Sequence, residues 1–298
     1  MCRLYGFHSN EETKVECSLV HAQNALMKQS ESDALGRTHA DGWGVAYYEN
    51  SHPTIVRRDL AAFEDRHFSH TAEKMFTNTV VAHVRLATVG EPKPHNAHPF
   101  HYGCWAFAHN GTVREFDTVR PWMLEDTEPW LQDLRGGSTD SEHVFHWLLS
   151  RINAHGIGLA RRRYDPSLLV DIVADSVDTI ADWCQQAGAQ KPAKLNFVLT
   201  DGRILIATRF NHTLYFVRRE GLRDCELCGI PHVHHDPHVD YRAVVVASEK
   251  ITHEEWHTVP NGGLVFVDED SHLHEYLIED VIGRPLTGLV AEEPLSCH

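Results

Sequence analysis

The chain of 298 residues has no hydrophobic run long enough to span a membrane. Its first residues also lack the basic segment and apolar stretch of a secretory signal peptide. These absences predict a cytoplasmic protein without a membrane partner. Apolar residues still make up 42% of the chain, so a substantial buried core can form.

Positive charge is also scarce, because 27 Lys and Arg residues stand against 42 Asp and Glu residues. The resulting formal charge of −15 repels phosphate backbones, which argues against a nucleic-acid partner. The one dense basic run, at 161–163, is expected to be a solvated surface cluster.

A disulfide framework of the secreted type is missing as well. The seven cysteines are odd in number and scattered through a chain without a secretion signal, which predicts reduced thiols. They are Cys2, Cys17, Cys104, Cys184, Cys225, Cys228 and Cys297. Histidine, by contrast, is abundant, and many of its 24 copies gather in short local clusters that raise the question of metal binding or proton chemistry.

No repeat and no low-complexity linker divides the chain, which predicts a single domain over residues 1–298. The predicted strands are 43–48, 54–60, 78–84, 104–111, 194–202, 203–209, 213–219, 242–248, 263–268 and 273–278. The predicted helices are 17–30, 138–156 and 166–188. Two segments, 120–137 and 221–241, are predicted to be irregular loops. Strands, two adjacent helices and further strands indicate an α/β (α+β) fold in which sheets pack with a helical layer.

Cys2 directly follows the initiator Met1. Methionine aminopeptidases remove Met before a small side chain such as Cys, and removal of Met1 would leave a thiol and a free α-amine on one residue. An α-amine with a pKa of about 7.7–8.0 is partly neutral near pH 7 and can accept the proton of the thiol. Cys2 is therefore a candidate nucleophile that carries its own base, although a cysteine near a terminus is more often without function.

Other short motifs have side chains suited to acyl transfer by a thiolate. Asn110 and Gly111 follow a predicted strand and offer an amide side chain and a backbone N–H for an oxyanion hole. Arg85 follows another strand and suits a carboxylate, and Asp140 begins a helix and suits an ammonium group. Each motif also has a structural interpretation: a hairpin turn for Asn-Gly, a surface ion pair for Arg85 and a helix cap for Asp140.

Taken in order, these motifs resemble those of the class II glutamine amidotransferases over residues 1–150. "MCRLYGFHS" resembles the processed start of that family, and "HADGWGVAYY" is similar to the D-G-W-G strand of its stand-alone members. "HVRLATVGEPKPHNAHPF" is similar to the signature H-x-R-x-A-T-x-G…N-A-H-P-F, "AHNGTV" to the oxyanion-hole motif and "TDSE" to the acidic motif. The resemblance implies a four-layer αββα sandwich of the N-terminal-nucleophile hydrolase type, with residues 221–241 as an inserted Cys/His-rich loop.

The resemblance also implies a catalytic or binding role for each matching residue. Cys2 would be the nucleophile and its α-amine the base, and Asn110 and Gly111 would form the oxyanion hole. Arg85 would bind the α-carboxylate of glutamine, and Asp140 would bind its α-amino group.

Further residues match positions around the glutamine pocket of that family. Thr88 would assist carboxylate binding from its loop, Trp43 and Gly44 resemble pocket-wall positions, and His98 is expected to order the loop. Leu86 departs from the Trp of many synthase-linked members, which puts the lid of the pocket in doubt, although stand-alone members are similar to this sequence there.

The implied reaction is attack of the thiolate on a γ-carboxamide, which gives a γ-glutamyl thioester that water releases as glutamate. The pattern uses most of the chain, and no glycine-rich phosphate loop is present, so an acceptor domain is not expected. The resemblance therefore implies an amidohydrolase for glutamine or a small γ-glutamyl compound, similar to the γ-glutamyl hydrolases of thiol metabolism, with no required cofactor. The alternatives are a glutaminase subunit that passes ammonia to a separate synthase, an acylase of the wider class, and an inactive member that binds a metal or ligand.

The segment "CELCGIPHVHHDPH" at 225–238 contains residue types that bind zinc, at plausible spacing. A second C-x-x-C is absent, so a polar loop without metal is an equally good interpretation. The candidates for a structural zinc that staples this loop are Cys225, Cys228, His232, His234, His235 and His238.

Overall fold

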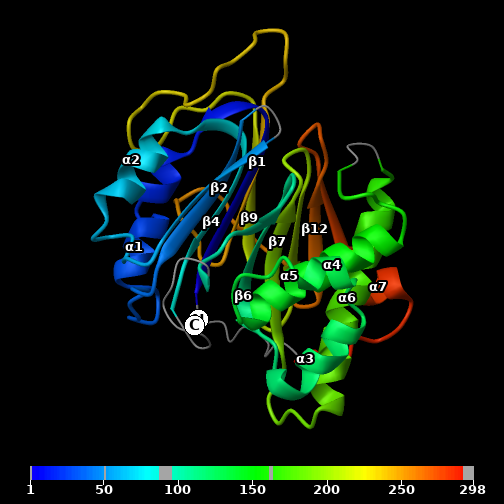
Figure 1. The fold of residues 1–298 in the computed structure, drawn as a ribbon. Coiled ribbons are helices and arrows are strands. Elements are labelled where there is room, and N and C mark those ends of the chain that lie inside the picture. Colours follow the sequence, from blue (N-terminus) through cyan, green and yellow to red (C-terminus); the bar gives the residue numbers. More distant parts are fainter. Residues whose placement is uncertain (1, 50–51, 87–95, 161–163, 291–298) are drawn as a thin grey trace, which may run out of the picture.

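The computed structural model describes residues 2–49, 52–86, 96–160 and 164–290. Over these residues, two antiparallel sheets face each other, and helices cover the outer face of each sheet (Figure 1). This arrangement confirms the four-layer αββα sandwich. No helix in the described ranges is both long and apolar enough to cross a lipid bilayer.

The first sheet contains seven strands, with the N-terminal strand near its centre. Their spatial order is β11 (His257–Thr258), β9 (Tyr215–Glu220), β10 (Arg242–Ala247), β1 (Arg3–Lys14), β4 (Phe76–Val84), β2 (Trp43–Glu49) and β3 (His52–Arg58). All its neighbouring strands pair antiparallel, so β1 begins beside the end of β4.

The second sheet contains six strands, also antiparallel. Their spatial order is β13 (Leu273–Leu277), β12 (Gly263–Val267), β8 (Leu205–Arg209), β7 (Lys194–Thr200), β6 (Trp105–Thr112) and β5 (Phe100–Tyr102). Asp201 and Gly202 form the turn between β7 and β8, as their sequence predicts.

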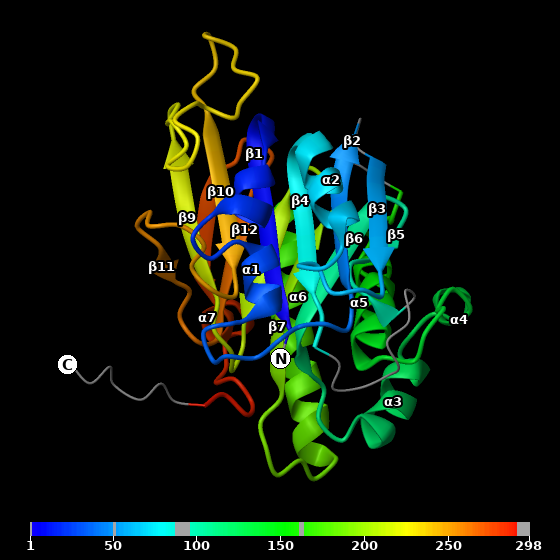
Figure 2. The ribbon, with the colours of Figure 1, turned by 90° about the vertical axis from the view of Figure 1, so that its left-hand side faces the viewer.

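The helices divide between the two outer faces (Figures 1 and 2). The first sheet is covered by the π-helix η1 (Cys17–His21), α1 (Leu26–Glu31) and α2 (Arg66–Lys74). The second carries α3 (Phe116–Glu125), α4 (Pro129–Gln132), α5 (Asp140–Ala154), α6 (Pro166–Gln186) and α7 (Ile278–Ile282) on its side of the molecule.

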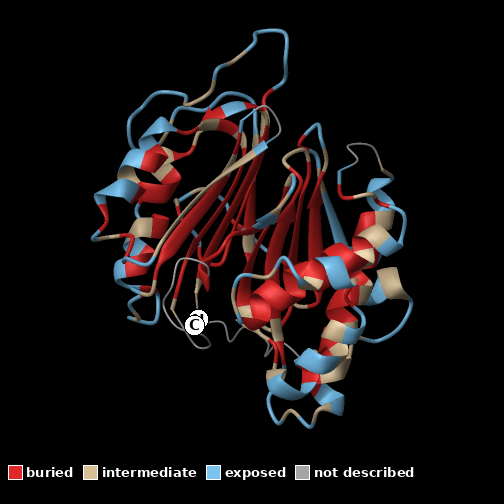
Figure 3. Cartoon of the chain, viewed as in Figure 1, coloured by how far each residue is buried: buried red, intermediate tan, exposed pale blue. Residues whose placement is uncertain are grey.

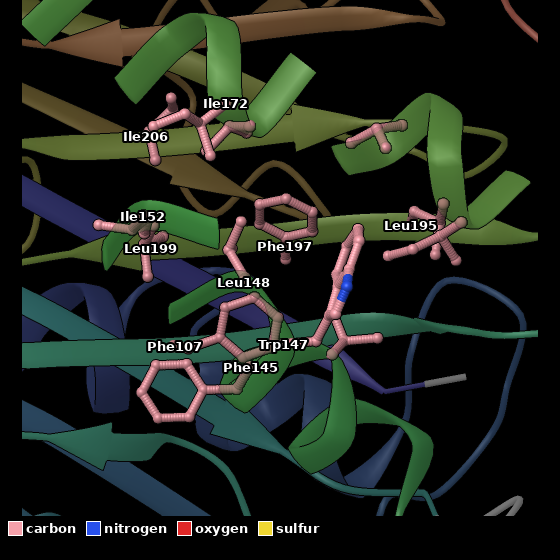
Figure 4. Packing of buried hydrophobic residues seen from close by; sticks show 14 of the residues in the cluster. Phe107, Phe145, Trp147, Leu148, Ile152, Ile172, Leu195, Phe197, Leu199 and Ile206 are labelled. Carbon is pink, nitrogen blue, oxygen red and sulfur yellow. The ribbon is translucent and has the colours of Figure 1, made fainter. Parts of the chain in front are cut away.

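Buried apolar side chains fill each of the three spaces between the layers. Figure 3 shows that most of the residues of both sheets are buried. Tyr5 and Phe7 of β1 point toward α1 and α2, whereas Leu4 points toward the second sheet, as the alternation of a strand requires. On the far side, Phe107 of β6 packs between Phe145 of α5 and Phe197 of β7, with ring centroids 5.5 and 5.3 Å apart (Figure 4). These layers hold both sheets rigidly against each other and their helices.

Local sequence explains where the two long helices begin. Thr139 caps α5 by accepting a hydrogen bond from the N–H of Glu142, and Asp165 caps α6 by accepting one from Ser167. Pro166 occupies the first turn of α6, where its missing N–H costs nothing. Asp140 is therefore the first helical residue and not the cap.

Two of the sequence-based predictions of secondary structure were wrong. The segment 120–137 contains the end of α3 and all of α4, because Val119, Met123 and Leu131 bury apolar side chains in the core beside α5. The single helix predicted over 17–30 is divided into η1 and α1, with a non-helical connection between them. The segment 221–241 is irregular, as predicted, apart from an isolated bridge.

Candidate functional site

The register of the first sheet brings Cys2 and Arg85 together. Arg3 pairs with Val84, so the residue before β1 lies beside the residues after β4. The N–H of Leu86 lies 3.4 Å from the Cys2 Sγ, and the thiol lies 3.5 Å from the Leu86 carbonyl oxygen. The thiol is thus held by backbone groups of the segment that carries Arg85.

Burial and several neighbouring groups act on the ionisation of the Cys2 thiol. Burial raises the pKa of this thiol above its ordinary value, even though the residue as a whole keeps partial contact with solvent. The N–H of Leu86 and the charge of Arg85 lower the pKa, and the carboxylate of Asp140 raises it. Both predicted head-group residues are therefore electrostatic neighbours of Cys2, and the thiol needs a proton acceptor close by to ionise.

Arg3 fixes the backbone of Cys2 from the other side. Its guanidinium is buried, donates to the Cys2 carbonyl oxygen at 2.9 Å, and bonds Asp33 and Glu249 at 2.7 Å each. Asp33 also accepts from the ring of His39 at 3.0 Å. Sequence reasoning missed this network, because the only local signal is an arginine next to Cys2.

Asn110 and Gly111 lie near the end of β6, in the second sheet. The side chain of Asn110 is fully buried, and neither its amide nitrogen nor its oxygen finds a partner among the described residues. A Cβ at Gly111 would overlap the Lys194 carbonyl oxygen and the ring of His109. Position 111 therefore requires glycine, and position 110 presents an unpaired buried amide.

Asp140 connects this strand to α5. Its carboxylate accepts hydrogen bonds from the N–H groups of Val113, at 2.9 Å, and Ser141, at 2.8 Å. Since Val113 directly follows β6, Asp140 lies next to the segment that carries Asn110. The same carboxylate acts on the Cys2 thiol, so groups from both sheets meet at one end of the sandwich.

The remaining predicted residues of the pocket occupy different surroundings. Trp43 is buried between the first sheet and α2, where its Nε1 donates to Asp65 at 3.0 Å. Gly44 is crowded, because a Cβ there would overlap the carbonyl oxygen of His98. The ring of His98 packs against His83, with centroids 4.2 Å apart. Met1, Thr88 and the basic run 161–163 lie outside the described residues.

The predicted zinc candidates separate into two groups. The ligand atoms of Cys225, Cys228 and His232 lie with that of Cys17 in a cluster whose members are all within 4.8 Å of one another. His234, His235 and His238 are not in this cluster. His234 stacks on Phe76, and His235 bonds Glu11 at 2.8 Å. Sequence reasoning missed Cys17, since nothing near this residue marks it as a ligand.

Two antiparallel sheets between helical layers, with a cysteine at the start of a central strand, define a fold of the N-terminal-nucleophile hydrolase class. The family model described as glutamine amidotransferases class-II matches residues 1–281, so the chain belongs to the class II glutamine amidotransferases.

Named relatives agree with this family. The chain is 26% identical to the probable glutamine amidotransferase DUG3 of Saccharomyces cerevisiae, over 94% of the chain and 85% of that protein. It is 30% identical to the γ-glutamyl-hercynylcysteine sulfoxide hydrolase of Mycobacterium tuberculosis, over 74% of the chain and 81% of that protein. The fold is similar to that of a glutamine aminotransferase class-II domain protein from Silicibacter pomeroyi, with a TM-score of 0.61, 20% identity and coverage of 92% and 97% of the two chains.

Proposed function

We propose that this protein hydrolyses the γ-amide of glutamine or of a γ-glutamyl compound, with Cys2 as its nucleophile. The observation that carries the proposal is the position of the thiol, which lies against Leu86 within the electrostatic reach of Arg85 and Asp140. A cation and an anion close to a nucleophile suit the carboxylate and ammonium groups of an amino-acid substrate.

The raised pKa of Cys2 makes a nearby base necessary. Once Met1 is removed, the α-amine of Cys2 itself is that base and takes the proton of the thiol. The thiolate attacks the γ-carbonyl carbon, and the tetrahedral intermediate collapses as the protonated amine gives its proton to the leaving nitrogen. Water then attacks the γ-glutamyl thioester, releases glutamate and restores the thiol.

The oxyanion of the intermediate would be held by the side-chain amide of Asn110 and the N–H of Gly111. The buried amide of Asn110 has no partner among the described residues, so its N–H groups are available to a substrate oxygen. Such preorganised donors stabilise charge that develops only in the transition state, which is why they accelerate the reaction.

The substrate head group would be bound at both charged ends. In this proposal Arg85 holds the α-carboxylate with help from Thr88, and Asp140 holds the α-ammonium group. Gly44 would form the wall behind the substrate, where a side chain would overlap the carbonyl oxygen of His98, and Trp43 would support this wall from the outer layer beside α2. His98 would thereby order the segment that follows Arg85.

Hydrolysis is preferred to ammonia transfer because one relative that is 30% identical is named a hydrolase of a γ-glutamyl compound. Another relative is named a probable glutamine amidotransferase, which is consistent with the alternative that ammonia passes to a separate synthase.

In the test, purified protein is incubated with glutamine and with a panel of γ-glutamyl amides. The loss of Met1 is checked beforehand by intact mass. We expect glutamate release from at least one of these compounds, and labelling of Cys2 by an electrophile that mimics glutamine. Release from glutamine alone would restrict the proposed hydrolysis to glutamine itself. No release from any substrate, or labelling at another cysteine, would overturn the proposal.

A further inference from the structure

Four ligand atoms converge at the end of β1 that lies away from Cys2. Cys17, Cys225, Cys228 and His232 each offer one atom, all within 4.8 Å of one another. The His232 Nε2 lies 2.9 Å from the Cys228 Sγ and 3.4 Å from the Cys17 Sγ. Ligands of a tetrahedral zinc ion, with bonds of about 2.3 Å to sulfur and 2.0 Å to nitrogen, lie about 3.5–3.8 Å apart.

The backbone of β1 holds His232 in place. The His232 carbonyl oxygen accepts from the N–H of Lys14 at 2.8 Å, and the N–H of His234 donates to the Glu12 carbonyl oxygen at 3.1 Å. Val233 forms a β-bridge with Thr13 between these two bonds. This part of the loop is therefore an extension of the sheet, which fixes the imidazole without any metal.

A tight turn holds Cys225 and Cys228. The N–H of Gly229 donates to the Cys225 carbonyl oxygen at 2.9 Å, and Gly229 has a φ of +71° that favours glycine. The N–H of Leu227 points at the Cys225 Sγ from 3.5 Å. An amide directed at sulfur stabilises a thiolate, and the turn presents both sulfurs to one side.

Cys17 comes from a third element, the π-helix η1. Leu19 and Val20 of that helix are buried in the core between the first sheet and its helices. The Cys17 carbonyl oxygen also accepts from Ala22 at 2.8 Å, which closes the π-helical turn. The position of this thiol is thus set by the core and not by the loop.

Space and charge beside the cluster also suit a cation. A cavity of about 190 Å³ is lined by Cys17, Cys225 and His232. Arg219 in its wall is paired with Glu254 at 2.8 Å, and Lys14 is paired with Glu16 at 2.7 Å. Lys14 and Arg219 are therefore engaged by carboxylates, and Arg223, the third cation in the wall, acts on Glu254.

We propose that Cys17, Cys225, Cys228 and His232 bind one Zn²⁺ ion in a closed, structural site. Three thiols lose their protons on binding, and the neutral imidazole contributes the fourth bond, which leaves no open position for catalysis. The ion ties the loop 221–241 to η1 and to the end of β1. It lies far from Cys2, because the 12 residues of β1 span about 35–40 Å and the loop projects from the opposite end (Figure 2).

The test measures zinc in full-length protein produced with zinc in the medium and freed of loosely bound metal. We expect about one zinc ion per chain in the native protein, and less than about a tenth of that in Cys17→Ser and in Cys228→Ser. Co²⁺ in place of zinc should give the visible absorption of a tetrahedral thiolate complex. His238→Ala, in the same loop but outside the cluster, is the matched control and should keep its zinc.

Two variants from different elements protect the test against a folding failure. Cys228 is exposed in the loop, so its replacement leaves the core intact, and circular dichroism reports the fold of each variant. The proposal is overturned if the native protein holds no zinc, or if both serine variants keep it. A disulfide among Cys17, Cys225 and Cys228 in freshly purified protein would also overturn it.

Discussion

The two cysteine sites at the ends of β1 have opposite characters (Figure 2). Cys2 is set against the backbone of Leu86 and lies close to one cation and one anion. Cys17 belongs to a group of three thiols and one imidazole, with no role in the proposed reaction.

The difference shows how the surroundings of a thiol define its use. A nucleophile needs one ionisable sulfur, a proton acceptor and room for a substrate, so additional thiols would compete with it. A structural metal needs several sulfurs gathered by rigid elements, so that the ion saturates them and leaves none reactive. One strand connects the two sites, yet we expect that a mutation at either site leaves the function of the other unchanged.

The largest expected effect separates the two ends directly. Cys2→Ala should lower kcat for glutamate release by at least about 10³-fold, because the nucleophile is gone, and should leave the zinc content at its native value. Cys17→Ser should show the reverse, with zinc lost and kcat kept within about tenfold at a temperature where the variant is folded. Stopped assays of glutamate and metal analysis on the same samples measure both.

A chelator gives the same comparison without a mutation. Removal of zinc from the native protein should lower Tm, because an ion that binds only the folded chain stabilises the folded state. The kcat measured at low temperature, where the protein stays folded, should be nearly constant. If Cys17→Ser or chelation abolished activity in a protein that stays folded, the two ends would be coupled and the comparison would fail.

The second expected effect comes from a comparison of Asn110 with Asn196, the residue that pairs with it in register on the neighbouring strand. Asn110→Ala should lower kcat by about 10²–10³-fold, as loss of an oxyanion donor does, with Tm unchanged or higher because no hydrogen bond in the described structure is lost. Asn196 donates to the carbonyl oxygens of His212 and Thr213 and accepts from Phe210. Asn196→Ala should therefore cost about 1–3 kcal/mol of unfolding free energy.

Urea denaturation and steady-state kinetics on both variants make this test. Activity that falls while stability holds identifies a polar group kept for substrate. The idea is wrong if Asn110→Ala is destabilised as strongly as Asn196→Ala, since the amide of Asn110 would then serve the fold.

Local pattern indicated part of one end of β1 and left the other end largely hidden. Cys2 and Arg85 each sit in a short motif just before or after a strand, and the pairing of β1 with β4 brings Cys2 against Leu86, the residue after Arg85. Cys17 and His232 are 215 positions apart, and their contact depends on the order of β9, β10 and β1 in the sheet. No local periodicity encodes that order.

The fold was predictable to a similar extent. The α/β class and the two long helices agree with apolar spacing and capping residues, because those signals lie within one element. The helices α3 and α4 were missed, since they are short and stabilised by packing against α5 more than by their own sequence. The Arg3 network was missed for the same reason, because Asp33 and Glu249 reach it through the tertiary fold.

A smaller effect tests the proposed binding of the substrate carboxylate. Arg85→Lys keeps the charge near Cys2 but loses the planar fork that holds a carboxylate by two bonds. We expect KM for the preferred substrate to rise by about 10–30-fold, which corresponds to about 1.4–2 kcal/mol, with a smaller change in kcat. Zinc content should stay native. Initial rates over a range of substrate concentrations measure this, and an unchanged KM would remove Arg85 from the binding site.

The smallest expected effect contrasts a buried histidine near Cys2 with an exposed one at the metal end. Burial, with a smaller contribution from the charge of Arg85, lowers the pKa of His83 to about 3. The unfolded chain takes up a proton at this residue below its ordinary pKa of 6.5, whereas the folded chain does not. The stability contributed by a neutral His83 is therefore present above pH 6.5 and is lost as the pH falls toward 3.

Between pH 7.5 and 5.5 this linkage should cost about 1.4 kcal/mol of unfolding free energy for His83. His83→Leu removes the titrating ring. The unfolding free energy of this variant should therefore fall by about 1.4 kcal/mol less than that of the native protein between pH 7.5 and 5.5. Urea unfolding at both pH values measures the difference, and His238→Leu, at an exposed position in the loop of the metal cluster, controls for removal of an imidazole. Equal losses in the native protein and His83→Leu would mean that the fold does not hold His83 neutral, because only a residue with different proton uptake in the two states can change this slope.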